Sequence, residues 1–262
     1  MKRTEIRPDL NDFPVPFRAL LQNARVFDSS CSPEARVYFI EKDEGLFLKT
    51  AAAGMLKKEA LQDAYFHKKG LSAPVLDYRT ETGRDWLLTA RVPGEDCTNA
   101  RYLADPARLC DLIATQLRAL HELDTTDCPV PNHTENYAKT VTENHARGLF
   151  DPDYLSPQYR TLSADAAFSL FEEEKHRFGT DTLLHGDYCL PNILLDGWRF
   201  SGFIDLGNGG VGDRHVDLFW GAWTLAFNLG TDAYRDRFFD AYGRDRIDPT
   251  MIDLVSIAEC FG

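Results

Sequence analysis

The chain has 262 residues, of which 44% are hydrophobic and 27% charged, a composition typical of a globular protein with one large domain or two lobes. Its formal net charge of −12 at pH 7 disfavours nucleic acid and anionic membranes as partners. The same charge favours a cationic ligand, although a need for solubility alone would also explain it.

The first 13 residues and the cysteines indicate where the protein works. The N-terminal residues carry charges with no apolar stretch behind them, so we expect no signal peptide. The longest apolar run, 219–227, is too short to span a membrane. Six cysteines are scattered without a Cys-x-x-Cys pair, which argues against a metal knuckle or a disulfide framework. We therefore expect a cytoplasmic protein with reduced thiols that is a monomer or a weak dimer.

Residues 18–92 are rich in strand-forming side chains, with one helix inserted. The runs 36–40 and 46–49 flank a polar turn and predict a hairpin. Lys49 is expected to end the second strand, and Glu59 follows on a helix predicted over 56–68. An ion pair between strand and helix would fix the lysine ammonium, whereas a lysine at a strand end is more commonly solvated.

The remaining elements are mostly helical. A strand predicted over 85–92 is the last element of the first lobe, and Pro93-Gly94 ends this strand. Asp105-Pro106 then provides an N-cap and a first-turn proline for a long helix with leucines at helical spacing. Further helices are predicted at 135–147, 164–178, 213–229, 231–242 and 250–261.

The stretch 182–217 carries the chemistry. His185-Gly186-Asp187 is followed by Asn192, and Asp205 comes after a second apolar run. Asp196-Gly197 predicts a tight turn, so that Asn192 and Asp205 would flank a hairpin. Each residue alone has an ordinary explanation as a turn or cap residue. Together they are a set typical of phosphoryl transfer.

The expected roles follow from charge. Asp187 would orient the attacking hydroxyl group, Asn192 and Asp205 would hold Mg²⁺ on the nucleotide phosphates, and Lys49 would neutralise phosphate charge, held by Glu59. Phe47 shares a sheet face with Lys49 and would cover the adenine ring, or else be an ordinary core aromatic. The sequence therefore predicts an ATP-dependent kinase.

The motifs HGDYCLPN at 185–192 and FSGFIDLGN at 200–208 closely resemble those of the aminoglycoside phosphotransferases, particularly the 3′-phosphotransferases. The resemblance implies an α+β, two-lobed protein-kinase-like fold with a small N-terminal antiparallel lobe, residues 1–92, that contains one helix. A hinge at 93–99 would join it to a larger, mainly helical lobe, 100–262, with the active site between the two.

The resemblance also implies ligands. ATP, with GTP as the alternative nucleotide, and Mg²⁺ would be the cofactors. Ser32, in a polar loop without glycine, would let backbone amides approach phosphate, although a solvated turn is the alternative. Main-chain groups near Ala90 and Val92 would bind adenine. Asp217 resembles the buried acid that holds the backbone amides of the catalytic loop in related kinases.

The implied acceptor is a small cationic aminosugar, phosphorylated at its 3′-hydroxyl to give antibiotic resistance. The substrate-binding candidates are Asp151, Asp153, Glu259 and Phe261. The chain departs from the family pattern at Ala258, Asn208, Trp223 and Phe227. A kinase of the same fold acting on another aminosugar or small hydroxylated amine is therefore the second hypothesis, and a nucleotide-binding regulatory module without turnover is the third.

Overall fold

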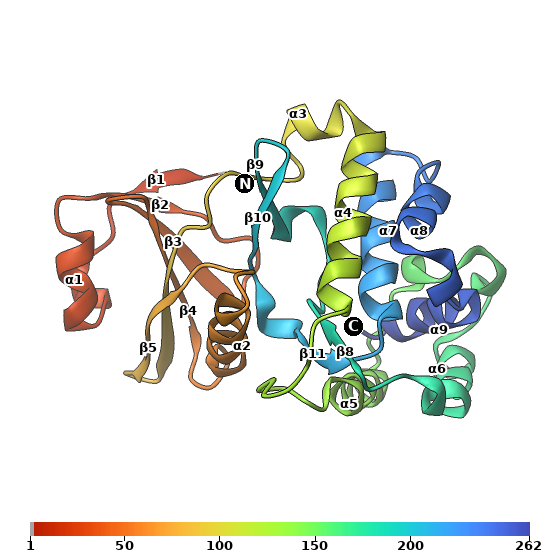
Figure 1. Cartoon of the computed structure of the whole chain (residues 1–262). Coiled ribbons are helices and arrows are strands. Elements are labelled where there is room, and N and C mark those ends of the chain that lie inside the picture. The colour runs from red at the N-terminus through yellow and green to blue at the C-terminus, as the bar shows by residue number, and fades with distance from the viewer. Residues whose placement is uncertain (1–2) are drawn as a thin grey trace. The chain divides into compact units, whose positions relative to one another are not determined.

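The computed structural model describes residues 3–262, which divide into two compact units (Figure 1). The first unit contains the chain up to Cys97 together with Pro191–Gly207, and the second contains Thr98–Leu190 and Asn208–Gly262. The lobe boundaries predicted from the sequence stay a prediction. The structure groups the hairpin of residues 191–207 with the first unit, although it lies within the range expected for the helical lobe.

A six-stranded antiparallel sheet forms most of the first unit, with the strand order β1-β2-β3-β4-β6-β5. Its strands are β1 (Thr4–Ile6), β2 (Arg25–Asp28), β3 (Ala35–Glu41), β4 (Leu46–Ala52), β5 (Val75–Glu81) and β6 (Arg84–Ala90). Side chains alternate between the two faces of each strand, and both faces are covered. The sheet therefore has two apolar layers.

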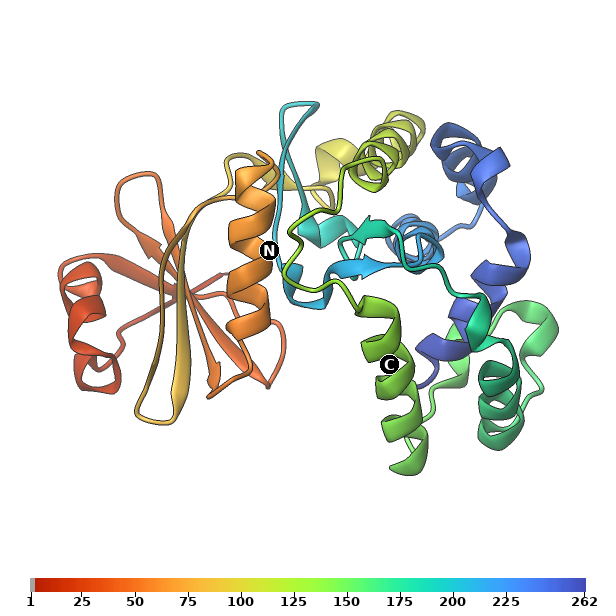
Figure 2. The same ribbon diagram turned by 60° about the horizontal axis from the view of Figure 1, so that its bottom comes forward.

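The helices α1 (Val15–Leu21) and α2 (Lys57–Lys68) lie on opposite faces of this sheet in both views (Figures 1 and 2). The α1 side is a core of large aromatic and aliphatic side chains, among them Phe13, Phe17, Tyr38, Leu48 and Trp86. The α2 side is smaller and consists of Ala51, Leu56, Ala60 and Leu87. Because α2 packs through small side chains, its backbone can approach the face that carries Lys49.

The hairpin of β9 (Ile193–Asp196) and β10 (Arg199–Phe203) pairs with the short strand β7 (Glu95–Asp96). The backbone N–H of Phe203 donates to the carbonyl of Leu71 at 2.7 Å, just after α2. This contact ties the base of the hairpin to the helix that carries Glu59.

The second unit is mainly helical. Its helices are α3 (Ala100–Leu103), α4 (Pro106–His121), α5 (His133–Ala146), α6 (Ala164–Glu174), α7 (His215–Leu229), α8 (Arg235–Tyr242) and α9 (Pro249–Glu259). Helix α4 runs beside α7, and both pack against α8 (Figure 1). A two-stranded ladder of β8 (Thr182–Leu184) and β11 (Gly210–Gly212) brings the loop that begins at His185 to the start of α7.

The predicted start of the long helix is confirmed. The carboxylate of Asp105 accepts the backbone N–H of Arg108 at 3.3 Å, and Pro106 occupies the first turn. The leucine and isoleucine side chains at helical spacing, Leu109, Ile113, Leu117 and Leu120, are all fully buried. This stripe makes α4 the core helix of the second unit.

Several predicted boundaries are wrong. Lys49 lies in the middle of β4, because backbone pairing with β3 and β6 continues beyond it. The helix predicted from residue 231 begins at Arg235, and the helix predicted over 164–178 gives way to a 3₁₀ turn at Lys175–Arg177. Helix α1 adds a second helix to the strand-rich part of the chain. The predicted fold class, α+β, is confirmed.

None of the described helices combines the length and the apolarity needed to cross a bilayer. All six cysteines, which lie within residues 3–262, are free thiols.

Candidate active site

An ion pair between Lys49 on β4 and Glu59 on α2 is the centre of the first unit's site. The Nζ atom of Lys49 lies 2.8 Å from both Oε1 and Oε2 of Glu59. It also lies 2.8 Å from Oδ1 of Asp205, at the end of the β9–β10 hairpin. Burial opposes the charge on Lys49, yet the two carboxylates raise its pKa. The predicted Lys–Glu pair is confirmed, and the ammonium group stays protonated at neutral pH.

A second acid, Asp63, lies one turn beyond Glu59 on the same helix. Its side chain is buried, and burial together with the charge of Glu59 raises its pKa well above the usual value. Burial and the charge of Glu59 thus both favour the neutral form of Asp63.

Asn192 and Asp205 lie at the same end of the β9–β10 hairpin. The backbone N–H of Ile204, which precedes Asp205, donates to the carbonyl of Asn192 at 3.1 Å. Asp205 has a φ of 60°, a left-handed conformation that a non-glycine residue rarely adopts, and its side chain is 52% exposed. Strain of this kind clusters at functional sites. The prediction that these two residues flank the hairpin is confirmed.

The other nucleotide candidates lie on the same unit. Ser32 is exposed in the turn between β2 and β3. Phe47 is half-buried, with its ring 5.2 Å from that of Phe39. The N–H of Ala90 already donates to the carbonyl of Pro74. Within residues 3–262 the N–H of Val92 has no such acceptor, so the adenine prediction depends on Val92.

In the second unit, Asp217 holds the backbone of the loop that carries Asp187. Its Oδ2 accepts the N–H of His185 at 2.7 Å, and its Oδ1 accepts the N–H of Gly186 at 2.8 Å. Asp217 is fully buried, which opposes ionisation, yet its hydrogen bonds, chiefly that from His121, lower its pKa. The structural role predicted for Asp217 is confirmed.

The loop after β8 is fixed at further points. The N–H of Asp187 donates to Nδ1 of His185 at 3.3 Å, so the neutral His185 ring carries its proton on Nε2. The hydroxyl of Tyr188 donates to the carbonyl of Ile113 on α4 at 2.8 Å. The N–H of Leu190 donates to Oγ1 of Thr224 on α7 at 3.1 Å. Asp187 itself is half-buried on this rigid loop.

Gly186 is required where the loop turns. Its φ is +82°, and a Cβ atom there would lie 2.2 Å from the backbone oxygen of Asn208. Only glycine allows this close approach of two chain segments.

His121 extends the support of Asp217 to α8. Its Nε2 lies 3.2 Å from Oδ2 of Asp217, and its Nδ1 lies 2.9 Å from the hydroxyl of Tyr242. Burial lowers the pKa of His121, so the ring is neutral. Its Nε2–H then donates to Asp217, and Nδ1 accepts from Tyr242.

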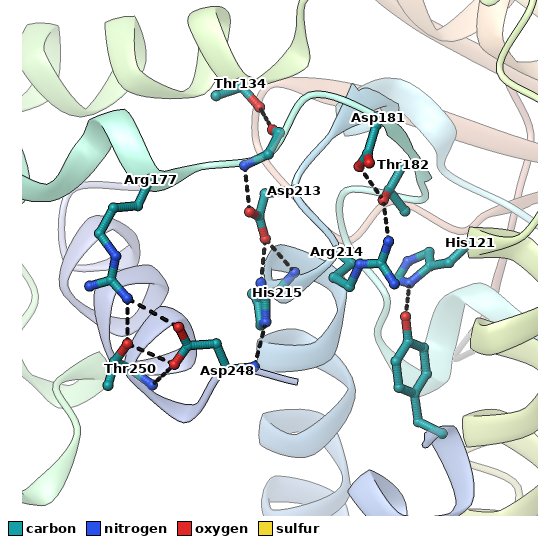
Figure 3. Close-up of polar contacts among 12 residues, drawn as sticks. His121, Thr134, Arg177, Asp181, Thr182, Asp213, Arg214, His215, Asp248 and Thr250 are labelled. Carbon is teal, nitrogen blue, oxygen red and sulfur yellow. Dashed lines mark hydrogen bonds and ion pairs between the residues drawn. The ribbon is translucent and has the colours of Figure 1, made fainter. Parts of the chain in front are cut away.

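A second buried network fixes the start of α7 (Figure 3). Oδ1 of Asp213 accepts both the backbone N–H and the Nδ1–H of His215, at 2.8 and 2.6 Å, and its Oδ2 accepts the N–H of Gly179 at 2.6 Å. The backbone N–H of Asp248 donates to Nε2 of His215 at 3.0 Å, which sets the tautomer of the ring. This network orients the helix that carries Asp217.

The carboxylates of Asp151, Glu259 and Asp187 raise the pKa of the Tyr154 phenol, after the larger effect of burial. Asp151 is exposed and accepts the N–H of Asp153 at 3.0 Å, and its own N–H donates to the carbonyl of Cys260 at 2.7 Å.

Glu259 and Phe261 are buried. Oε1 of Glu259 accepts the hydroxyl of Tyr137 at 2.7 Å, and burial raises the pKa of Glu259 to about 7. The Phe261 ring is fully buried against Phe150 and Phe168. The ring belongs to the core, and the substrate contact expected of Phe261 stays a prediction.

A family model described as the phosphotransferase enzyme family matches residues 32–251. The chain belongs to this family. A probable aminoglycoside 3′-phosphotransferase from Lactococcus lactis subsp. lactis is 48% identical over 258 residues, which cover 98% of each chain. Streptomycin 3″-kinase from Streptomyces griseus is 33% identical over 207 residues, 75% of this chain and 74% of the kinase. The resemblance recognised in the motifs is thus confirmed.

The structural comparison agrees. The crystal structure of an aminoglycoside-3′-phosphotransferase of type VIII matches this phosphotransferase with a TM-score of 0.76 at 23% identity, over 96% of each chain. At that identity the match concerns the fold, and the expected protein-kinase-like fold is confirmed.

The sequence reasoning missed several supporting residues of this phosphotransferase. The sequence motifs assign no role to four of them: His121, Tyr242, Asp213 and His215. The sequence does contain a signal for part of this network. Asp213, His215 and Asp217 stand at every second position around the predicted start of a helix, where polar side chains commonly cap the first turn. His121 lies within the motif LHELDTTDCP, but its partner is 96 residues away.

Proposed function

We propose that this phosphotransferase moves the γ-phosphate of ATP to a hydroxyl group of an aminoglycoside, most simply the 3′-hydroxyl, and so confers resistance. The observation that carries the proposal is the Lys49 ammonium group held at 2.8 Å by both Glu59 and Asp205. This is the phosphate-binding set of a kinase. ATP is an intracellular cofactor, which supports a cytoplasmic location.

The nucleotide would be bound by the first unit. The Lys49 ammonium group supplies positive charge for the phosphates, and Glu59 fixes it in place at no entropic cost during turnover. Phe47 and the N–H of Val92 are proposed to contact adenine, and the turn at Ser32 to approach phosphate. Because phosphoryl transfer has a loose transition state, positioning and charge compensation supply most of the acceleration.

Asn192 and Asp205 are proposed to hold Mg²⁺, which supplies charge neutralisation on the phosphates. The chemistry of the donors fits, because Mg²⁺ takes oxygen ligands, and one or two from the protein suffice when phosphates and waters supply the rest. No cluster of three or more His, Cys, Asp or Glu within residues 3–262 offers a protein-only metal cage. The exposed Asp205 carboxylate would exchange its Lys49 contact for the cation.

Asp187 is proposed as the group that accepts or orients the proton of the acceptor hydroxyl. It lies on a loop fixed by Asp217, and its backbone N–H is engaged by His185. A carboxylate held on a rigid loop can act on a hydroxyl without reorganising first. The carboxylates of Asp151, Asp153 and Glu259 are proposed to attract the amino groups of the acceptor.

The proposal of an aminoglycoside acceptor rests on the names of the relatives. These names give different phosphorylated positions, 3′ for the relative from Lactococcus lactis and 3″ for the relative from Streptomyces griseus. The higher identity of the first supports the 3′ position. A kinase acting on a different aminosugar or small hydroxylated amine is the second candidate. It is favoured by Ala258 and Asn208, which stand at positions where the chain departs from the family pattern.

The test is a coupled ADP-release assay of the purified chain with ATP, Mg²⁺ and a panel of aminoglycosides, followed by NMR of the product. We expect turnover with at least one aminoglycoside and a phosphate on its 3′-oxygen. Asp187→Asn should lower kcat at least about a thousandfold with little change in ATP affinity. The exposed Asp232 of the same unit provides the control, Asp232→Asn, which should keep full activity.

Three results would count against the proposal. Turnover confined to hydroxylated amines that are not aminoglycosides would support the second candidate. Loss of ATP affinity in Asp187→Asn would contradict the role of that residue toward the acceptor. A Michaelis constant for the acceptor that does not rise with salt would argue against a polycationic substrate.

A further inference from the structure

Four aromatic side chains of the second unit contact one another in a series, here called the aromatic face: Tyr154, Trp220, Trp223 and Phe227. The rings of Tyr154 and Trp220 are 5.6 Å apart, those of Trp220 and Trp223 5.4 Å, and those of Trp223 and Phe227 4.9 Å. The last pair is stacked, with an angle of 11° between the ring planes. Three of the four come from α7 at positions i, i+3 and i+7, so they lie on one side of that helix.

The aromatic face is open toward one end. Phe227 is 70% exposed, the largest exposed fraction of any large hydrophobic side chain within residues 3–262. Trp220, Trp223 and Tyr154 are half-buried, whereas the opposite side of α7 contributes fully buried residues such as Leu218. A run of contacting aromatic rings that ends in solvent is typical of a binding surface.

The other end of the aromatic face meets the acceptor-side acids. Oε1 of Glu259 accepts the hydroxyl of Tyr137 at 2.7 Å. Burial raises the pKa of the Glu259 carboxyl group most, and Trp220, which lowers it, and Asp187, which raises it, also contribute. The negative charges of Asp151, Glu259 and Asp187 add to the effect of burial in raising the pKa of the Tyr154 hydroxyl. Between Trp220 and Phe227 on α7 lies Thr224, which accepts the N–H of Leu190 from the Asp187 loop. Electrostatic contributions thus relate Tyr154 and Trp220 to the proposed acceptor acids, and α7 is hydrogen-bonded to the loop that carries Asp187.

We propose that the aromatic face is a subsite for the acceptor, on which a sugar ring lies with its C–H face against Trp223 and Phe227. This inference rests on the proposed function and specifies how its substrate is held. Sugar C–H groups next to amines are electron-poor and are attracted to the electron-rich face of an aromatic ring, and an ammonium group gains a cation–π contact there. The neighbouring carboxylates complement the remaining amino groups.

The occupant follows from the combination of charge and shape. A purely apolar ligand would gain nothing from Asp151, Glu259 and Asp187, and a simple polyamine without rings would leave the stacked pair uncovered. A polyamino sugar satisfies both. Trp223 and Phe227 thus determine specificity, while Asp187 remains the catalytic residue.

Phe227→Ala and Trp223→Ala test the inference by steady-state kinetics with each aminoglycoside that the wild-type enzyme phosphorylates. We expect the acceptor KM to rise by about 3-fold to 30-fold, while the KM for ATP and the kcat change by less than about 2-fold. Phe227→Tyr should keep the wild-type KM because it keeps the ring. Leu76→Ala, at another exposed apolar position, on β5, serves as the control and should change nothing.

Tryptophan fluorescence adds a readout of binding without turnover. Addition of aminoglycoside in the absence of ATP should quench emission of the wild type, and Trp223→Phe should lose most of the quenching while keeping its KM within about 3-fold. Because Phe227 is largely exposed, its variants should fold even if Trp223→Ala does not.

The possible outcomes distinguish a failure of the aromatic subsite from a failure of the proposed kinase activity. An unchanged acceptor KM in Phe227→Ala, with the wild type active on aminoglycosides, overturns this inference and leaves the proposed function intact. Absence of turnover with every aminoglycoside overturns both. If sedimentation shows a wild-type dimer that Phe227→Ala converts to monomer without a change in KM, the aromatic face is a contact between two copies, and the inference is wrong.

Discussion

Asp217 on α7 accepts the Nε2–H of His121 on α4 at 3.2 Å, while the same carboxylate holds the backbone N–H groups of His185 and Gly186. Three donors thus converge on one fully buried carboxylate. An ionised group in that position is stable only while all its donors are present. The arrangement makes the geometry of the Asp187 loop depend on residues that touch neither reactant.

Asp217→Asn is expected to destabilise the protein by about 3 kcal/mol and to lower kcat at least about a hundredfold, because an amide group cannot accept three hydrogen bonds. Urea unfolding and steady-state kinetics measure the two effects. His121→Phe should lower the stability and kcat by smaller amounts, since it removes only one of the three donors to Asp217. A fully active Asp217→Asn enzyme would show that the loop does not need this support.

Lys49→Met should raise the KM for ATP and lower kcat, together reducing kcat/KM for ATP by at least about a hundredfold, because phosphate charge would lack its fixed partner. Glu59→Gln should act in the same direction but more weakly, since the variant keeps the Lys49 ammonium group and loses only the carboxylate that positions it. Lys57→Met, at an exposed position at the start of α2, is the matched control and should behave as the wild type. Equal effects of Lys49→Met and Lys57→Met would refute a specific phosphate contact.

Gly186→Ala should abolish activity and cost about 3 kcal/mol or more of stability, since the new methyl group would overlap the backbone oxygen of Asn208. Gly148→Ala isolates the conformational part of this effect, because Gly148 also has a positive φ, of 72°, but open space around it. That control should lose only about 1 kcal/mol and remain active. Thermal unfolding and activity assays compare the pair.

Glu259 should make stability fall as pH rises. Burial raises its pKa in the folded state to about 7, from an ordinary value of 4.5, so the folded state retains the proton after the unfolded state has lost it. The stabilisation is complete below the unfolded pKa and is lost as pH rises through the folded pKa. The total change is about 3 kcal/mol between about pH 4.5 and about pH 7.

Urea unfolding of the wild type and of Glu259→Gln at several pH values isolates this contribution. The variant carries a neutral side chain of similar shape, so the difference in free energy of unfolding between the two proteins should depend on pH in that window. A pH-independent difference would show that Glu259 is ionised in the fold throughout.

Local chain patterns determined much of the site. The alternation of β4 placed Phe47 and Lys49 on one face, the leucine spacing of α4 predicted its buried stripe, and the Asp196-Gly197 turn predicted the hairpin between Asn192 and Asp205. These features depend on side-chain periodicity and turn conformation, which act over a few residues. The family motifs, which are also short local stretches of sequence, predicted the protein-kinase-like fold.

Only the tertiary structure decided which distant groups meet. Lys49 and Asp205 are 156 residues apart, Tyr137 and Glu259 are 122 apart, and neither pair has a local signal. Packing also buried the ring of Phe261, and it brought Tyr154 against Trp220 of α7. Burial and long-range contacts depend on how whole elements fill space, and periodicity within one element does not encode that.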